Sequence, residues 1–326
     1  MNKVIYDTDP GIDDAMALLF LHYAPQVKLV GITTVMGNAP IEITTRNALF
    51  LKQKFNIACP VAQGARFPLM GAFHPAPVHI HGADGLGNIA LPEVVEGELD
   101  PRPAHRFIID MVKAHPHEIS IVAVGRMTNL ALALREAPEI AGLVKQVVLM
   151  GGGFGFHGHL GNITPAAEAN IHGDPLAADE IFGANWPLTV VGLDVTVETM
   201  MDQAYLQDLH VQAGMAGEFI WDISRLYEEF YTSIGINGIC VHDSSAVAYL
   251  IAPELFETRS GPIRVVMEGI AYGQTIQKAD RRGHPPGAWD NRPSHKICID
   301  VQREAFLKLY RDVIIEGARA AEALPV

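Results

Sequence analysis

Apolar and polar positions follow two alternating patterns over the first 193 residues of this chain. Short runs rich in Val and Ile predict buried strands, and longer stretches with apolar residues every three or four positions predict helices. The predicted strands begin at residue 4 and continue at residues 27–35, 58–62, 119–124, 146–150 and 188–193. The predicted helices lie at about residues 12–18, 40–55, 103–115 and 128–137, with later ones near 174, 204–210, 216–235 and 242–252.

This order of elements predicts the fold class. Strands that alternate with helices are typical of an α/β protein with an open, doubly wound, mostly parallel sheet and helices on both faces. Strand-like runs at residues 263–268, 274–278 and 296–301 are expected to extend that sheet or to form a small hairpin. The chain has no internal repeat or linker, so residues 1–326 are interpreted as a single domain. The segment 64–101, rich in Gly, Pro and His, is expected to be a functional connection or a lid.

Composition and charge narrow the class of protein. A hydrophobic content of 49% fits parallel strands buried on both faces. No apolar run approaches the roughly 18 residues of a membrane span, and residues 1–3 lead into acids and not into a signal peptide, so a soluble, cytoplasmic protein is expected. The scattered Cys59, Cys240 and Cys298 fit a reducing cytosol. A net charge of −13 argues against nucleic-acid polymers and membranes as partners but permits a small neutral substrate.

The stretch between the first strand and the first helix is strongly acidic. Asp7, Asp9, Asp13 and Asp14 fall within eight residues, and such crowding is costly unless a cation lies among the carboxylates. A tight turn leaves Asp9 at the carboxyl end of the strand, the edge where open α/β sheets bind ligands. Asp13 and Asp14 lie in the first helical turn, where the helix dipole favours anions. Capping alone does not need four acids, so the stretch predicts a hard-cation site made of oxygen ligands.

Other candidate residues follow the ends of different predicted strands. Asp9, Asn38, Thr128 and Met150 each lie just after a strand, so the doubly wound fold places them along one rim of the sheet. A pocket at this rim is therefore expected. His242-Asp243 begins a helix after an apolar run and is unusual as a buried ionisable pair, although an N-cap Asp with a neighbouring His is an alternative.

Three other patterns suggest different chemistry. Residues 153–158 fit GxGxxG, but no amphipathic helix follows, so dinucleotide binding is rejected. The pairs His79/His81 and His157/His159 lack a cysteine or carboxylate at a familiar zinc spacing. Asp7-Thr8-Asp9 resembles the nucleophile pair of the haloacid-dehalogenase phosphatases, so a Mg²⁺-dependent phosphatase is the alternative function; a non-catalytic ribose-binding protein is a third.

Taken together, these residues resemble the nucleoside hydrolases, in particular the inosine-uridine preferring branch. Residues 7–15, Asp-Thr-Asp-Pro-Gly-Ile-Asp-Asp-Ala, match the signature of that family almost letter for letter. The likeness covers nearly the whole chain in the family's order, through Gly37-Asn38, His81-Gly82, Thr128-Asn129, residues 150–153, Gly161-Asn162, Thr164-Pro165, Ala167-Glu168, Asn170, Asp174-Pro175 and His242-Asp243.

The resemblance implies calcium-dependent hydrolysis of the N-glycosidic bond of ribonucleosides, with release of base and ribose. In this reading Asp9, Asp14 and Asp243 give carboxylates to Ca²⁺, Thr128 gives its backbone carbonyl, and ribose hydroxyls and a water complete the shell. Asp9 is also the general base, and attack by the metal-bound water inverts C1′. The resemblance further implies a homodimer or homotetramer.

The resemblance also implies which residues contact the substrate. Asp13 and Asn38 would hold the ribose diol, and His81 and His242 would lie toward the base, with His242 the proton donor. The residues implied at the 5′ end are Asn162, Glu168 and Asn170, with Met150 nearby.

Elementary chemistry supports this assignment without the family. Breaking a glycosidic bond develops positive charge on the sugar and negative charge on the departing base. Carboxylates around the ribose suit the first, and a histidine beside the base can protonate the second. Ca²⁺ takes six to eight oxygens at about 2.3–2.6 Å, enough for protein, diol and water together.

The chain departs from the family pattern at two positions, and one role stays open. Ala169 replaces the usual aromatic residue, which implies a roomier pocket, and Arg126 stands where Pro is commoner. Tyr227 and Tyr231 are spaced either to stack on the base or to pack in the core.

Overall fold

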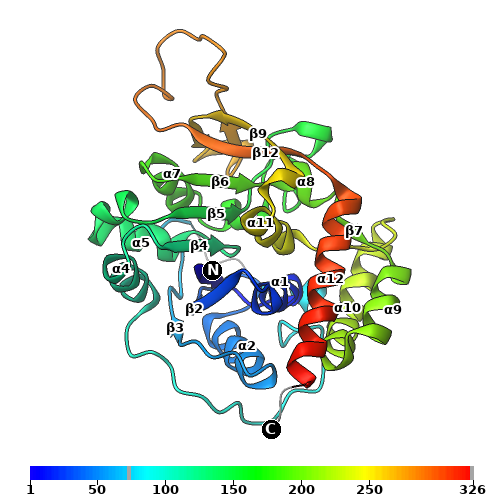
Figure 1. Ribbon diagram of the computed structural model, residues 1–326. Coiled ribbons are helices and arrows are strands. Elements are labelled where there is room, and N and C mark those ends of the chain that lie inside the picture. The colour runs from blue at the N-terminus through cyan, green and yellow to red at the C-terminus, as the bar shows by residue number, and fades with distance from the viewer. Residues whose placement is uncertain (72–74, 324–326) are drawn as a thin grey trace.

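An eight-stranded sheet forms the centre of the protein (Figure 1). This computed structural model describes residues 1–71 and 75–323. Adjacent strands are parallel except β9, which runs antiparallel to β12. In sheet order the strands are β3 (Val61–Gln63), β2 (Val27–Thr34), β1 (Asn2–Thr8), β4 (Ile119–Ala123), β5 (Gln146–Met150), β6 (Leu188–Val191), β12 (His295–Val301) and β9 (Phe256–Gly261). The predicted single α/β domain with a mostly parallel sheet is confirmed.

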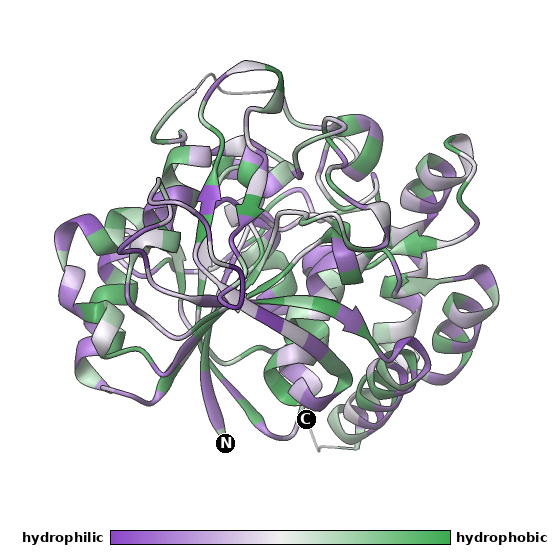
Figure 2. Ribbon diagram, turned by 90° about the horizontal axis from the view of Figure 1, so that it is seen from above, coloured by the Kyte–Doolittle hydropathy of each residue, from purple (hydrophilic) through white to green (hydrophobic). Residues whose placement is uncertain are grey.

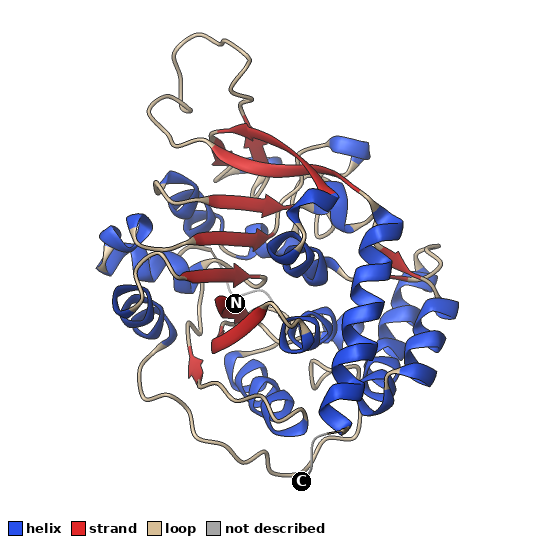
Figure 3. Cartoon of the chain, viewed as in Figure 1, coloured by secondary structure: helices blue, strands red, loops and turns tan. Residues whose placement is uncertain are grey.

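Helices cover both faces of the sheet (Figure 3). The helices on one side are α1 (Ile12–Tyr23), α2 (Ile41–Lys54), α10 (Gly214–Ser233), α11 (His242–Ile251) and α12 (Arg303–Glu322). Those on the other side are α4 (Ala104–Ala114), α5 (Thr128–Glu136) and α7 (Pro175–Gly183). Because successive side chains of a strand point to opposite faces, Val4 and Tyr6 of β1 join the first core and Ile5 joins the second. The central strands β4 and β5 are buried almost throughout, whereas Figure 2 shows both polar and apolar residues along the ribbons on the β9 and β12 side of the molecule.

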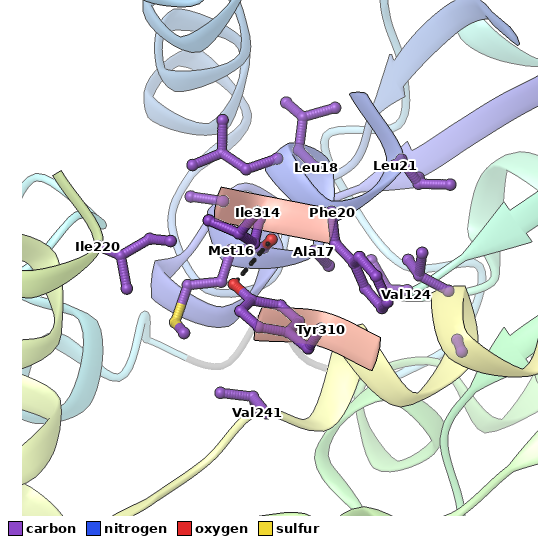
Figure 4. Close-up of a cluster of buried hydrophobic side chains, with 14 of the residues drawn as sticks. Met16, Ala17, Leu18, Phe20, Leu21, Val124, Ile220, Val241, Tyr310 and Ile314 are labelled. Atoms are coloured by element: carbon purple, nitrogen blue, oxygen red, sulfur yellow. Dashed lines mark hydrogen bonds between the residues drawn. The ribbon is translucent and has the colours of Figure 1, made fainter. Parts of the chain in front are cut away.

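The first core holds α1 from several sides. Residues 12–21 of this helix are all buried. Tyr310 of α12 packs its ring on Phe20, with the ring centroids 4.9 Å apart, and its hydroxyl donates a hydrogen bond of 3.3 Å to the Met16 carbonyl (Figure 4). Ile220 of α10 approaches the same helix (Figure 4). The helix that carries Asp13 and Asp14 is therefore fixed on a rigid scaffold.

The late strands confirm both parts of their prediction, and one strand of the eight-stranded sheet was missed. β12 extends the sheet, while β10 (Ile263–Val265) and β11 (Thr275–Gln277) form an antiparallel pair. The edge strand β9 was not predicted because its sequence FETRSG is buried only at its two ends and shows no apolar alternation.

The remaining elements are short. The helices are α3 (Val78–His81), α6 (Ala169–Gly173), α8 (Leu193–Thr196) and α9 (Gln203–Gln212); the 3₁₀ turns are η1 (Pro138–Gly142), η2 (Phe156–Gly158), η3 (Pro253–Leu255) and η4 (Gly269–Ala271); and β7 (Met200–Met201) pairs with β8 (Ile239–Cys240). In the segment 64–101, of which 72–74 lie outside the described residues, α3 is the one helix that the structure describes. Over 1–71 and 75–323, no helix combines the length and apolar character needed to cross a bilayer.

Candidate active site

The predicted site residues converge where the strand order reverses. The chain proceeds from β1 outward to β2 and β3, then returns to place β4 on the other side of β1. The carboxyl ends of β1 and β4 therefore border the crevice in which doubly wound sheets bind ligands. Asp9 follows β1 at this point, and Gly125 follows β4 beside it.

Hydrogen bonds fix the two carboxylates nearest this crevice. Asp14 accepts from the Thr8 hydroxyl at 2.5 Å, from the Gly11 N–H at 3.0 Å and from the Asn38 side-chain amide at 2.8 Å. Asp9 accepts from the Asn38 backbone N–H at 2.7 Å through Oδ2. Its buried Oδ1 has no hydrogen-bond partner among the described residues. A buried carboxylate oxygen without a partner is costly, so this atom is suited to a cation or a water.

Two glycines allow the chain to close around Asp9. A Cβ at Gly37 would lie 1.8 Å from Asp9 Oδ2, and one at Gly125 would lie 2.5 Å from Asp9 Oδ1. Any other residue at either position would collide with the carboxylate. The close approach of these loops holds Asp9 in one place.

Asp14 also belongs to a cluster of three buried acids in the same region. One carboxylate oxygen each of Asp13, Asp14 and Asp243 lies within 4.8 Å of the others. Burial raises the pKa of all three, and the Asp14 carboxylate raises that of Asp13 further. Burial and then Asp14 also raise the pKa of Asp9 well above its usual value. Such repulsion is relieved by a cation, and a set of oxygens without nitrogen or sulfur suits a hard one such as Ca²⁺.

The neighbours of this acid cluster include the other predicted ligand and a buried cation. Thr128 begins α5, is fully buried, and donates its hydroxyl to Asp174 at 2.7 Å. Arg126 is 8% exposed, and its Nη1 has no partner in the described part of the chain. The charges of Asp9 and Asp174 oppose the lowering of the Arg126 pKa by burial.

Two histidines and two tyrosines also border the acid cluster. His242 begins α11, with Nδ1 2.7 Å from the Thr196 hydroxyl and Nε2 3.0 Å from the Tyr231 hydroxyl. The Tyr227 and Tyr231 hydroxyls are 3.4 Å apart, and the Tyr227 and His81 ring centroids are 5.6 Å apart. Burial lowers the pKa of His242 to about 4 and is the main cause that lowers that of His81 to about 3, so both are neutral at pH 7. The His81 ring accepts a hydrogen bond from the Ile12 N–H at Nδ1, which leaves its proton on Nε2.

The residues predicted at the 5′ end form a connected group beside the acids. The Glu168 carboxylate caps α6 and accepts from the N–H groups of Gly152, Asn170 and Ile171 at 2.9–3.2 Å. Other bonds tie this group together: Asn162 Oδ1 accepts from the Ala169 N–H, and Asn170 donates to the carbonyls of Val124 and Met150. The charge of Glu168 raises the pKa of Asp13 and Asp243. The structure thus brings all the predicted site residues into one region.

Two contacts in the site were missed from the sequence. Tyr231 had been left between base stacking and core packing, yet it contacts His242. Thr196 was not singled out, although its place just after the predicted strand 188–193 is a rim position like those of Asp9 and Thr128. The histidine pairs rejected as zinc ligands lie outside the acid cluster, which is the one potential metal-ligand group of three or more within the described residues.

Fold and site together define an α/β protein with a buried, oxygen-only acid cluster at the switch point of its sheet, as expected of a metal-assisted enzyme. Comparison with known proteins is more specific: residues 4–308 match the inosine-uridine preferring nucleoside hydrolases. The chain belongs to this family, whose members are hydrolases acting on N-glycosyl compounds. The alternative of a haloacid-dehalogenase phosphatase is wrong, and Gly173 ends helix α6 where that class needs a preceding strand.

Individual relatives agree over nearly their whole length. Uridine nucleosidase 1 of Arabidopsis thaliana is 38% identical over 94% of this chain and 91% of its own. The inosine-uridine preferring nucleoside hydrolase of Crithidia fasciculata is 37% identical over 96% and 97%. The solved structure of a plant nucleoside hydrolase superposes with a TM-score of 0.92 at 35% identity, covering 96% of this chain and 99% of that one.

Proposed function

We propose that this chain is a calcium-dependent ribonucleoside hydrolase that releases a free base and ribose with inversion at C1′. The observation that carries the proposal is the cluster of Asp13, Asp14 and Asp243, near the His242–Tyr231 pair and beside Asp9 Oδ1, an atom without a hydrogen-bond partner among the described residues. The family match over residues 4–308 supports ribonucleosides as substrates and residues 1–326 as a single nucleoside hydrolase domain.

The residues that would hold the ion are Asp9, Asp14 and Asp243 through carboxylates and Thr128 through its main-chain carbonyl. When bound, calcium would orient the ribose diol and the attacking water. The donor set supports this assignment because it contains oxygen alone, and because the charges of these buried acids need compensation.

Asp9 is the proposed base for the attacking water. Its free Oδ1 can accept a proton, and burial together with Asp14 raises its pKa, which increases its basicity. A strong base is unnecessary because the glycosidic bond is largely broken before the water loses its proton. Asp13 and Asn38 are proposed to hold the ribose diol. The Asn38 side-chain amide already donates one hydrogen bond to Asp14.

The leaving base is proposed to receive its proton from His242. Because burial keeps this imidazole neutral at pH 7, the proton for the leaving base comes from an uncharged donor, either the imidazole N–H or a hydroxyl O–H. His242 Nε2 and Tyr231 Oη are 3.0 Å apart, so a proton given up by one can be replaced through the other. His81 is proposed to contact the base from the Tyr227 side.

The ribose 5′ end is proposed to lie against Asn162, Glu168 and Asn170, with Met150 beside it. Both Glu168 oxygens already accept hydrogen bonds from main-chain N–H groups. These bonds hold the loop after β5 and also keep the negative charge of Glu168 in the pocket. Ala169, with its small side chain in place of the family's usual aromatic one, is proposed to leave the pocket roomier. We further propose that the protein is a homodimer or homotetramer and that it is cytoplasmic. The buried free cysteines support the cytoplasmic location.

The test is release of free base from a panel of ribonucleosides, including inosine and uridine, with and without chelation. EDTA should abolish activity and added Ca²⁺ restore it, while Asp14→Asn should weaken calcium binding in calorimetry at least about tenfold, since it removes one charged ligand. Asp222→Asn, an exposed acid on α10, is the matched control. Full activity in EDTA, or tightly bound zinc in the purified protein, would contradict the proposal.

A further inference from the structure

A large cavity lies at the β9 edge of the sheet, away from the acid cluster at the β1–β4 switch point. It has a volume of about 1170 Å³ and opens beneath the loop 279–294, the orange arch above β9 and β12 in Figure 1. Its walls come from β9, β11, the end of β12 and the arch itself. None of the residues assigned above to metal, ribose or base contributes to its lining.

The cavity is positively charged in a strongly acidic protein. Arg259, Lys278, Arg281 and Arg282 line it, against two acids, Asp280 and Asp290, in a chain of net charge −13. These acids already have partners: Asp290 pairs with Lys278 at 3.3 Å, and Asp280 accepts from the Ser294 hydroxyl at 2.5 Å. Because a hydroxyl leaves the charge of Asp280 in place, three arginines and one carboxylate remain besides the Lys278–Asp290 pair.

Two of these arginines have no partner within the described residues. The side chains of Arg281 and Arg282 are exposed and have no hydrogen bond or ion pair with any residue in 1–71 or 75–323. Arg259 donates to the Gln277 side-chain oxygen at 2.8 Å and lies 4.7 Å from the Phe156 ring, which holds its guanidinium at the wall of the cavity. Burial is the main cause that lowers the Arg259 pKa; the Asp194 carboxylate opposes this shift, and the charge of Arg282 adds to it.

An apolar wall adjoins the arginines. Ile276 of β11 is 39% exposed although it lines the cavity, and Trp289 of the arch lies beside it, with its indole N–H donating to the Ile276 carbonyl at 3.3 Å. Ile299 of β12 adds to the same lining. Cations next to an aromatic and aliphatic wall match a ligand that joins an anion to a flat ring.

We propose that the cavity beneath residues 279–294 is a binding site for a phosphate-bearing ligand, with Arg259, Arg281 and Arg282 binding the phosphate and Ile276 and Trp289 contacting an attached ring. A nucleoside 5′-monophosphate combines both features. Arginine is suited to this task because its planar guanidinium can donate two parallel hydrogen bonds to phosphate oxygens. The site is separate from the acid cluster, whose charge disfavours phosphates, and the inference does not rest on the proposed hydrolase mechanism.

The experiment is calorimetric titration of the full-length protein at low ionic strength, with inorganic phosphate in one arm and inosine 5′-monophosphate in the other. Both should bind, the nucleotide more tightly because only it reaches the apolar wall. Trp289 fluorescence should change with the nucleotide, and this change should vanish in Trp289→Phe. Binding should weaken as salt is raised, since the arginines are solvent-exposed.

The discriminating variant is Arg281→Gln/Arg282→Gln, with Arg106→Gln/Arg135→Gln as a control that removes the same charge from surface ion pairs elsewhere. The first should raise the Kd for both ligands at least about tenfold, and the second should leave it nearly unchanged. No binding at millimolar ligand, or equal losses in both double variants, would overturn the site. Equal affinity for phosphate and nucleotide would overturn the apolar contact.

Discussion

His295 and His242 are both buried histidines, but their surroundings suit them to different roles. His242 has a hydroxyl at each ring nitrogen, so protons can reach and leave it. His295 of β12 lies 3.0 Å from the Phe182 carbonyl through Nε2, and its Nδ1 has no partner among the described residues. The surroundings of His242 therefore suit proton transfer, whereas those of His295 hold a neutral ring in place.

The buried His295 should make stability depend on pH. Burial lowers its pKa, so the unfolded chain binds a proton more readily than the folded one. Its contribution is present above the unfolded pKa of roughly 6.5 and is lost as pH falls, by at most about 1.4 kcal/mol per pH unit. Urea unfolding at pH 7.5 and 5.5 should show a smaller loss in His295→Gln than in wild type. Equal losses would contradict this, and His284→Gln, in the exposed loop, is the control.

Replacing His242 should separate leaving-group protonation from positioning. In His242→Ala, kcat for inosine should fall by about 10²–10⁴, the usual contribution of a general acid. A riboside with a nitrophenolate leaving group departs without protonation and should retain most of its rate. Parallel steady-state assays on the two substrates provide the measurement. Equal losses on both would show that His242 acts by positioning the substrate.

At the scale of elements, the glycines after β2 and β4 hold the Asp9 carboxylate in place. Gly37→Ala should displace Asp9, because the new Cβ would lie 1.8 Å from Oδ2. Since misplacement by about 1 Å can cost 10²-fold, kcat/KM should fall by at least about that factor, and calcium affinity should fall with it. Gly142→Ala is the control, because no atom lies within 4 Å of its Cβ position. A fully active, calcium-binding Gly37→Ala enzyme would refute the role of this close approach.

The elements best predicted from the sequence are those with local signals. β5 was predicted at its observed bounds, and α2 and α4 within a residue or two at each end, because buried β-branched runs and amphipathic periods are readable within one segment. The acids of residues 7–15 were found for the same reason. The Thr196–His242 contact joins residues 46 apart, and the polar edge strand β9 is specified by its pairing with β12; neither leaves a local pattern.

For the whole molecule, charge should select among substrates. The site gathers Asp9, Asp13, Asp14, Asp243 and Glu168, in a chain of net charge −13, whereas Arg126 is the buried cation beside them. Like charges about 4 Å apart repel by about 4 kcal/mol at an effective dielectric of 20, equivalent to several hundredfold or more in rate. Inosine should therefore exceed its 5′-monophosphate in kcat/KM by at least that factor.

This comparison needs a variant that keeps the loop intact. Glu168→Gln would place an amide against main-chain N–H groups and disturb the loop. Arg126→Gln is therefore the sharper variant, because removing the nearby cation should increase the ratio of kcat/KM for inosine to that for its 5′-monophosphate. Comparable wild-type rates on nucleoside and nucleotide would refute the charge argument. The same assay at raised salt should narrow the difference modestly, because buried charges are poorly screened.

The antiparallel closure of the sheet has a consequence for biosynthesis. β6 leaves the ribosome roughly one hundred residues before β12, the strand that pairs with it, and β9 emerges while its own partner is still unmade. Until β12 is translated, β6 presents an open parallel edge, the kind of surface that recruits other unfinished chains. Translation pauses between residues 191 and 295 should therefore raise the demand for chaperones. Pauses after residue 301 should not, because all strands of the sheet have then been synthesised.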